Sequence, residues 1–277
     1  MKITHLILVH ENPLQIKRLI QRLAHPDADF YVHVDLKTDI NPFLFLQSQN
    51  IKFIINRVRV HWGAYSVVQA TVNGLSEILK TGNKYDYINL MSGQDYPLKS
   101  TSDIHYFLEN NPNKAFMHTL SVENEWKEAI HRITKYHLSE YTFLGKYTLE
   151  KWLNLFLPLR KMPNNLVAVG RSQWFTITST HAEYLVNYLQ KNKNVKRFFE
   201  LTWGSDEFVF QTILFNSEYQ KDIVNDNLRY IDWSEKKASP KTLTINDLST
   251  LLNSGKLFAR KFNETLDCLI INELDKQ

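Results

Sequence analysis

The sequence contains a single cysteine, Cys268, which excludes a disulfide within the chain and suits a reducing compartment. Glycine and proline are also scarce, with 8 of each in 277 residues. We find no repeat or low-complexity run, so collagen-like and disordered classes are excluded. No apolar run reaches the roughly 18 residues that cross a bilayer, and residues 3–9 are too short for a secretory signal core. We therefore expect neither a transmembrane helix nor a signal peptide.

The sequence also lacks a large net charge and glycine-rich nucleotide-binding motifs. The formal net charge is only +4 and the basic residues are dispersed, which argues against nucleic acid as a partner. One local basic stretch contains Lys191, Lys193, Lys196 and Arg197. It is either a solvated surface or a contact with an anionic membrane. No Gly-x-Gly-x-x-Gly follows the first predicted strand and no Walker A loop occurs, which weighs against a dinucleotide oxidoreductase.

Hydrophobic periodicity predicts alternating strands and helices over most of the chain. The predicted strands are residues 3–10, 30–35, 51–56, 85–91, 115–120, 166–178 (a strand pair or a strand with its loop) and 228–233. The predicted helices are residues 13–23, 65–80, 102–110, 182–191, 247–253 and 267–276. The first strand, helix and strand form a βαβ unit, which implies a mostly parallel sheet. We predict a single α/β domain over residues 1–277, with 121–165 as an insertion beside the active face and 92–98 as a loop.

Ligands of open parallel sheets bind beyond the carboxyl ends of the strands, and that rule selects candidate residues. They are His10, Asp35, residues 57–62 and residues 92–95. His10 is placed to touch a nucleotide or to cap its loop. Asp35 either binds a uridine base or ribose or is a turn aspartate. Asp95 either contacts a sugar or holds its loop by accepting from backbone amides.

The tetrapeptide Gly204-Ser205-Asp206-Glu207 carries the strongest chemical signal. Ser205 is a plausible N-cap, which would place Asp206 and Glu207 in the first turn of an apolar helix. Acids there can simply complement the helix dipole. Successive helical residues point about 100° apart, so the two carboxylates should not share one role.

Seven short segments occur together in a recognisable order along nearly the whole chain. They are LVHENP (8–13), YVHVD (31–35), HWGAYS (61–66), LMSGQDYP (90–97), SQWF (172–175), SDEF (205–208) and LFARKF (257–262). In these segments the chain resembles the core-2/I-branching β-1,6-N-acetylglucosaminyltransferases and the related protein O-xylosyltransferases. The likeness is poorest over residues 121–165.

The resemblance implies a GT-A-type fold and inverting transfer from a UDP-sugar, with N-acetylglucosamine or xylose as the expected sugar and neither a metal nor another cofactor. It implies that Glu207 is the general base and that Trp233 contacts the acceptor. Lys261 and Arg260, expected on a loop preceding a helix, and Lys241 match the family's diphosphate-binding positions. Residues 1–120 would bind the nucleotide sugar. Residues 166–277 would hold the acceptor, the catalytic residue and the diphosphate-binding segment.

Physical chemistry supports these roles independently. Inverting transfer needs one carboxylate to take a proton from the attacking hydroxyl, and fixed cations can stabilise the leaving diphosphate in place of a metal. Trp62 and Trp174 are either sugar platforms or core residues, and Gln173 stands beside the second of them. We therefore treat Gln173 and Trp174 as candidate acceptor or sugar contacts.

Asp27-Ala28-Asp29 has the form of a metal-binding DxD motif. It precedes the second predicted strand, at the end of the sheet opposite the expected ligand, so we interpret it as a polar turn. His10, His25 and His33 also lack a short metal-ligand spacing. We expect His33, inside a strand, to be a core residue.

The chain departs from the animal branching enzymes, which carry a membrane anchor and several cysteines. This difference suggests a bacterial-type enzyme of polysaccharide or oligosaccharide assembly, cytoplasmic or peripheral at the inner face of the membrane. Its acceptor would be a glycan, a lipid-linked oligosaccharide or another hydroxyl compound. The alternatives are a catalytically silent carbohydrate- or nucleotide-binding protein on the same fold and a basic surface-binding module.

Overall fold

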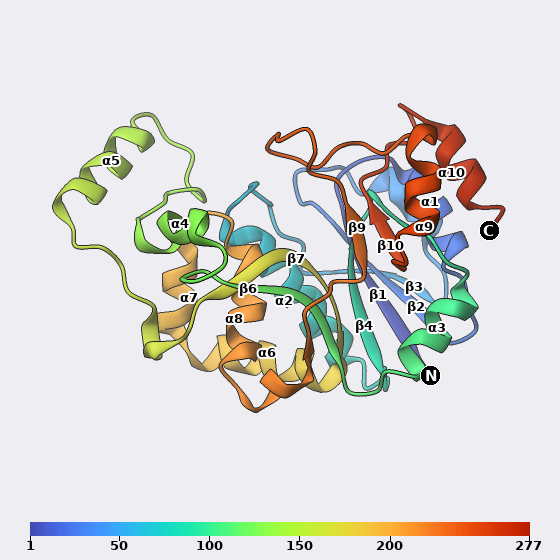
Figure 1. The fold of residues 1–277 in the computed structure, drawn as a ribbon, viewed down its shortest axis with the longest axis horizontal. Coiled ribbons are helices and arrows are strands. Elements are labelled where there is room, and N and C mark those ends of the chain that lie inside the picture. The colour runs from blue at the N-terminus through green and yellow to red at the C-terminus, as the bar shows by residue number, and fades with distance from the viewer.

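A seven-stranded sheet forms the centre of the computed structural model, which describes residues 1–277 (Figure 1). Its order is β3-β2-β1-β4-β7-β6-β8. The strands are β1 (Ile3–Val9), β2 (Ala28–Val34), β3 (Ile51–Phe53), β4 (Tyr87–Ser92), β6 (Ala115–Ser121), β7 (Val169–Thr178) and β8 (Ile223–Val224). All pairs are parallel except those of β7, which runs antiparallel to β4 and β6. The predicted α/β class with a mostly parallel sheet is confirmed.

Helices cover both faces of this sheet (Figure 1). They are α1 (Pro13–Arg22), α2 (Tyr65–Lys80), α3 (Thr101–Glu109), α4 (Ile130–Thr134), α5 (Lys146–Phe156), α6 (Ser179–Lys191), α7 (Lys193–Glu200), α8 (Val209–Phe215), α9 (Leu248–Asn253) and α10 (Cys268–Leu274). Short 3₁₀ turns are η1 (Asn41–Leu46), η2 (Lys127–Ala129), η3 (Pro163–Asn165), η4 (Ser205–Glu207), η5 (Glu218–Asp222) and η6 (Ile245–Asp247). None of the helices combines the length and the apolar character needed to cross a bilayer.

The two faces of the sheet belong to two separate cores. Along β1, Ile3 and Ile7 pack into the core that contains α1 and α10, whereas Leu6 packs into the core that contains α2, α6 and α8. Alternate side chains of a strand point to opposite faces, so a strand buried on both sides is mostly apolar, although β1 also buries Thr4 and His5. This double burial explains why residues 3–9 have the hydrophobicity of a signal core without being one.

A second, three-stranded sheet corrects the sequence-based prediction. Its order is β5-β10-β9, with β5 at Asp95–Pro97, β9 at Arg229–Ile231 and β10 at Phe258–Arg260. The prediction of an irregular loop at 92–98 is therefore wrong, as is the placement of Arg260 on a loop. Three-residue strands are too short to show a period, and only their partners define them.

The insertion at residues 121–165 contains α4 and α5, and α5 projects away from the sheet (Figure 1). Helix α7 was not predicted, because its only buried residues are Val195 and Phe199. The basic stretch of the sequence forms this helix and the end of α6. Its lysine and arginine side chains are mostly exposed.

Candidate active site

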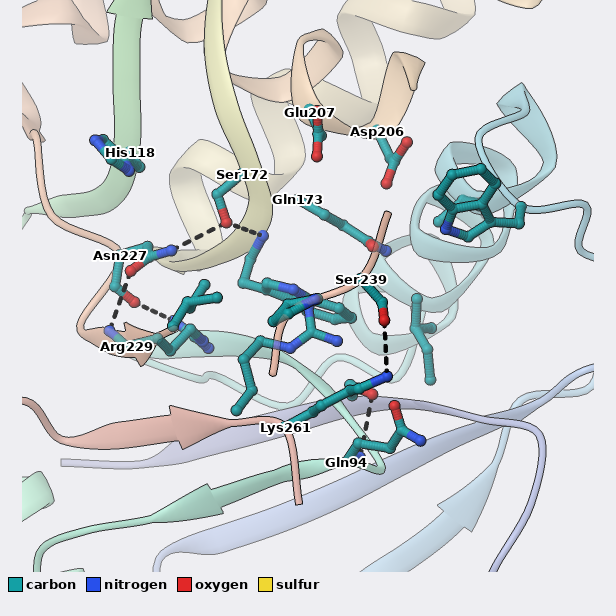
Figure 2. A pocket seen from close by; sticks show the side chains of 18 of the residues that line it. Gln94, His118, Ser172, Gln173, Asp206, Glu207, Asn227, Arg229, Ser239 and Lys261 are labelled. Atoms are coloured by element: carbon teal, nitrogen blue, oxygen red, sulfur yellow. Dashed lines mark hydrogen bonds between the residues drawn. The ribbon is translucent and has the colours of Figure 1, made fainter. Parts of the chain in front are cut away.

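A cavity of about 890 Å³ lies at the carboxyl ends of β1, β2 and β4, where open parallel sheets bind ligands. Its other walls come from the start of β7, turn η4, β9 and the end of β10 (Figure 2). Six basic side chains line it, namely Lys37, Arg171, Arg229, Lys256, Arg260 and Lys261. Four acidic side chains also line it, namely Asp35, Asp206, Glu207 and Asp226. The excess of positive charge favours an anionic ligand.

Turn η4 carries Asp206 and Glu207 into one wall of the cavity, while Lys261 lies against the opposite wall in the view of Figure 2. The prediction that Ser205 caps an α-helix is wrong. Its hydroxyl is buried without a hydrogen-bond partner, Gly204 precedes the turn at φ 66°, and α8 begins only at Val209. Glycine adopts this left-handed conformation without steric cost. The carboxylates therefore lie in a 3₁₀ turn, with about 120° between successive side chains.

Two close backbone approaches hold this turn. The Gly204 amide donates to the Gly63 carbonyl at 2.7 Å. At Gly170 on β7, a Cβ atom would lie 2.1 Å from the Glu207 carbonyl oxygen. Only glycine permits such contact, so the position of the Glu207 backbone is fixed by the strand beneath it.

Arg132 of α4 is the direct partner of Glu207. Its Nη1 donates to Glu207 Oε2 at 2.6 Å, and its guanidinium lies 4.3 Å from the centroid of the Trp203 ring. Burial raises the pKa of Glu207, and Arg132 opposes that shift. Burial and the neighbouring Glu207 carboxylate raise the pKa of Asp206 to about 7. Both carboxyl groups are thus more basic than free acids, and a proton acceptor near neutral pH requires that property.

Arg260 is held rigidly at the edge of the cavity. Its Nε lies 3.2 Å from Asp95 Oδ1, and its guanidinium lies 4.3 Å from the centroid of the Trp174 ring. Asp95 is fully buried behind the wall, where it also accepts from the Ser92 amide at 3.3 Å and lies 3.8 Å from Arg229 Nε. Asp95 does not line the cavity, so the structure favours the loop-holding alternative over the sugar contact. Trp174 is a buried core residue that contacts Arg260 and also lines the cavity.

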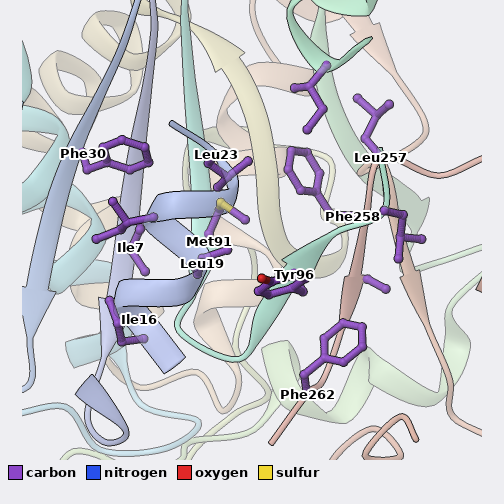
Figure 3. Packing of buried hydrophobic residues seen from close by; sticks show 14 of the residues in the cluster. Ile7, Ile16, Leu19, Leu23, Phe30, Met91, Tyr96, Leu257, Phe258 and Phe262 are labelled. Carbon is purple, nitrogen blue, oxygen red and sulfur yellow. The ribbon is translucent and has the colours of Figure 1, made fainter. Parts of the chain in front are cut away.

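Buried hydrophobic residues pack around the segment that carries Arg260 and Lys261 (Figure 3). The rings of Tyr96 (β5) and Phe262 pack edge to face, with 5.9 Å between their centroids. Phe258 of β10 belongs to the same hydrophobic cluster. The Phe262 amide donates to the Gln94 carbonyl at 2.9 Å. These contacts lie on either side of Arg260 and Lys261 and fix the course of the backbone that carries them.

The structure separates the two lysines assigned to a diphosphate. Lys261 lines the cavity, and its Nζ donates to Ser239 Oγ at 3.2 Å (Figure 2). Lys241 does not line the cavity, because its Nζ forms an ion pair with Asp247 Oδ1 at 2.6 Å. Asp232 lies 3.9 Å from the same ammonium group. Lys261 is therefore the lysine with capacity for an added anion.

The end of the cavity formed by β1 and β2 contains His10 and Asp35. Asp35 Oδ1 accepts from the Lys37 amide at 2.9 Å and from the Val60 amide at 3.4 Å. Asp35 therefore stabilises the turn that follows β2, and it also lines the cavity. His33 is buried, and its Nε2 accepts from the Val58 amide at 3.0 Å. Burial lowers the pKa of His33 to about 4, which keeps it neutral as a core residue.

Trp62 and Trp233 present exposed rings to the cavity, at 69% and 47% exposure. Gln173 also lines it, and its buried Nε2 has no hydrogen-bond partner. Open indole faces and an unsatisfied amide donor suit sugar rings with their hydroxyl groups.

The Asp27-Ala28-Asp29 motif lies outside the cavity, at the amino end of β2. Asp29 Oδ2 accepts from the Tyr85 hydroxyl at 2.6 Å and pairs with Lys2 Nζ at 2.9 Å. No group of three or more His, Cys, Asp or Glu residues is arranged to hold a metal ion.

Several lining or contacting residues escaped sequence reasoning, namely His118, Arg132, Arg171, Asn227 and Arg229. Arg132 lies in the insertion, where neither a motif nor a period marks it. Arg171 immediately precedes the SQWF segment and Arg229 opens the short strand at 229–231. Only the nearness of Arg171 to the SQWF segment and of Arg229 to the start of a strand could have indicated them.

Comparison with known proteins identifies relatives over nearly the whole chain. Xylosyltransferase 2 of Rattus norvegicus is 25% identical over 304 residues, which cover 99% of this chain and 33% of that protein. Beta-glucuronosyltransferase GlcAT14B of Arabidopsis thaliana is 25% identical over 278 residues, covering 95% and 62%. The apo structure of mouse xyloside xylosyltransferase 1 superposes with a TM-score of 0.41 and 10% identity, over 93% of this chain and 97% of that one. The chain spans about a third of the length of the xylosyltransferases it matches.

A family model that matches most of the sequence identifies the family of this chain. Residues 3–252 match the model of the Core-2/I-Branching enzyme family. That range contains β1, turn η4 and most of the cavity wall. The chain belongs to the Core-2/I-Branching enzyme family.

Proposed function

We propose that this chain is an inverting GT-A-type glycosyltransferase that moves a sugar from a UDP-sugar to an acceptor hydroxyl. The observation that carries the proposal is one cavity with paired acids on one wall and Lys261 with Arg260 on another. Family membership and xylosyl- and glucuronosyltransferase relatives support sugar transfer. Xylose and N-acetylglucosamine are the donor sugars that we would test first.

In the proposed step, the acceptor oxygen forms a bond to the anomeric carbon as the bond from that carbon to the diphosphate oxygen breaks. Glu207 accepts the proton of the attacking hydroxyl. The UDP leaves with the electron pair, and Lys261 and Arg260 stabilise its added charge in the manner of an oxyanion site. Asp95 and Trp174 act as positioning residues, because they orient the Arg260 guanidinium.

The Arg132–Glu207 contact suits such a base in two ways. It orients the carboxylate, and it keeps the pKa of Glu207 below the value that burial alone would produce. We propose that the step needs no metal, since fixed cations line the cavity where the diphosphate would lie.

The decisive experiment is a donor-hydrolysis screen over several UDP-sugars in the presence of EDTA, accompanied by thermal unfolding with UDP. Slow hydrolysis reveals a donor without knowledge of the acceptor, and UDP should stabilise the fold by mass action. Stabilisation without hydrolysis of any UDP-sugar would favour the catalytically silent binding protein. Failure of UDP to stabilise the fold would refute the proposed donor site.

A further inference from the structure

Residues 141–161, called here the projecting segment, expose an unusual amount of apolar surface. The segment contains α5 and extends from the body of the molecule (Figure 1). Its exposed large hydrophobic residues are Tyr141, Phe143, Leu144, Tyr147, Leu149, Trp152, Leu155, Phe156, Leu157 and Leu159. Leu144 is fully exposed, and α5 has no buried residue. A continuous apolar surface of this kind marks an interaction site.

Helix α5 is amphipathic with its polar face turned toward the protein. Asn154 exchanges hydrogen bonds of 2.8 Å with the Tyr136 backbone, and Glu150 accepts from the Leu138 amide at 2.8 Å. Trp152 lies about 200° around the helix from Glu150, at about 100° per residue, and therefore on the opposite face. On that face the Trp152 ring stacks on the Phe156 ring, with 5.2 Å between the ring centroids. The outward apolar face is thus fixed by internal hydrogen bonds.

The charges of the segment have one sign at the surface. Its charged residues are Lys146, Glu150, Lys151, Arg160 and Lys161. Glu150 is turned inward, and Arg160 is buried against the carbonyls of Lys135 and Leu201. Lys151 and Lys161 are exposed and remain for an outside partner, whereas Lys146 is half-buried on the same side of α5 as Glu150. Helix α7, which adjoins the segment through Arg160, adds exposed Lys193 and Arg197.

We propose that the projecting segment docks on an anionic membrane surface, with its aromatic and leucine side chains in the headgroup–acyl boundary. Tryptophan and tyrosine favour that boundary, and amphipathic helices with basic residues bind there in the plane of the interface. The lysines complement the charge of anionic lipids. A second copy of this chain is disfavoured as the occupant, because pairing the segments would bring like charges together. This inference is independent of the proposed transfer reaction.

Vesicle co-sedimentation tests the inference with the full chain. We expect binding to vesicles of phosphatidylcholine containing phosphatidylglycerol, and much weaker binding to phosphatidylcholine alone. Leu144→Asp should weaken binding about tenfold or more, since it places a charge at the apolar tip. Replacement of Lys151 and Lys161 by alanine should weaken it by about fivefold per lysine charge lost.

Leu269→Asp is the matched control, because Leu269 is an exposed leucine on α10, at the other end of the molecule in Figure 1. It should leave vesicle binding unchanged, and Leu144→Asp should leave UDP-sugar hydrolysis in solution unchanged. Absence of binding to the mixed vesicles, equal binding to both vesicle types, or equal loss in the two leucine variants would overturn the inference. Light scattering that shows a dimer dissociated by Leu144→Asp, without vesicle binding, would assign the surface to a second copy.

Discussion

Substitution of Glu207 by glutamine separates proton transfer from every other property of the site. The variant keeps the size of the side chain, and its carbonyl oxygen can still accept from Arg132 Nη1, which donates at 2.6 Å in the present structure. The bond keeps its charged donor and loses only the attraction between two opposite charges, so the structural loss is about 1 kcal/mol. Loss of the proton acceptor should slow transfer by about 10²–10⁴-fold. That range corresponds to about 2.7–5.5 kcal/mol in the activation barrier, well above the structural loss.

Asp206→Asn is the matched control for Glu207→Gln, because it makes the same acid-to-amide change in the same turn. If the charge of the turn alone mattered, both variants would lose the same activity. We expect Asp206→Asn to lose much less than Glu207→Gln. Initial rates of transfer and UDP binding by calorimetry, with folding checked by circular dichroism, complete the comparison.

Near-normal turnover in a folded Glu207→Gln enzyme that binds UDP would refute the assignment. A larger loss in Asp206→Asn would transfer the role of base to Asp206. The pH profile adds an independent check. Replacement of Arg132 by methionine removes the group that holds the pKa of Glu207 down, so the acidic limb of the activity profile should move to higher pH.

Three further predictions concern charge. Lys261→Ala should weaken UDP binding about 10–150-fold, the equivalent of one charge-assisted bond, whereas Lys241→Ala should change it little; calorimetry on the pair checks this difference. Because the folded-state pKa of Asp206 is raised to about 7, its ionisation destabilises the fold as pH rises from about 4 to 7. Asp206→Asn should therefore raise the unfolding temperature at pH 8 more than at pH 5, and equal effects at both would contradict that shift. Transfer should survive EDTA, and Asp29→Ala should leave turnover intact; activity restored only by manganese would exclude metal-independent chemistry.

Long periodic elements were predictable from the sequence, whereas short partner-dependent ones were not. Helix α2 has the predicted bounds at both ends, because its apolar positions repeat over sixteen residues. Strands β5 and β10 have three residues each, and only their pairing with each other and with β9 defines them. At this length, periodicity carries no information.

Candidate site residues in recognisable segments were predictable, whereas those whose role depends on tertiary contacts were not. Glu207, Lys261 and Trp233 come from segments with recognisable motifs or neighbours, and the structure brings all three to one cavity. Lys241 was chosen because it matches a family position, but such a match cannot reveal that Asp247 already pairs with it. Arg132 was missed because its segment has neither a motif nor a period, and only the tertiary fold places it at Glu207.

The pairing of β5 with β10 has a consequence for biosynthesis. Asp95 and Arg260 are strand partners from distant parts of the chain, and their contact closes a very long loop. Such non-local contacts form late, because the entropy of loop closure opposes them. On the ribosome, β1, β2 and β4 can pair while the last residues are still being added, yet the wall that carries Arg260 and Lys261 cannot exist until β10 emerges. A nascent chain should therefore acquire its parallel sheet before the wall of the cavity that carries Arg260 and Lys261 is complete.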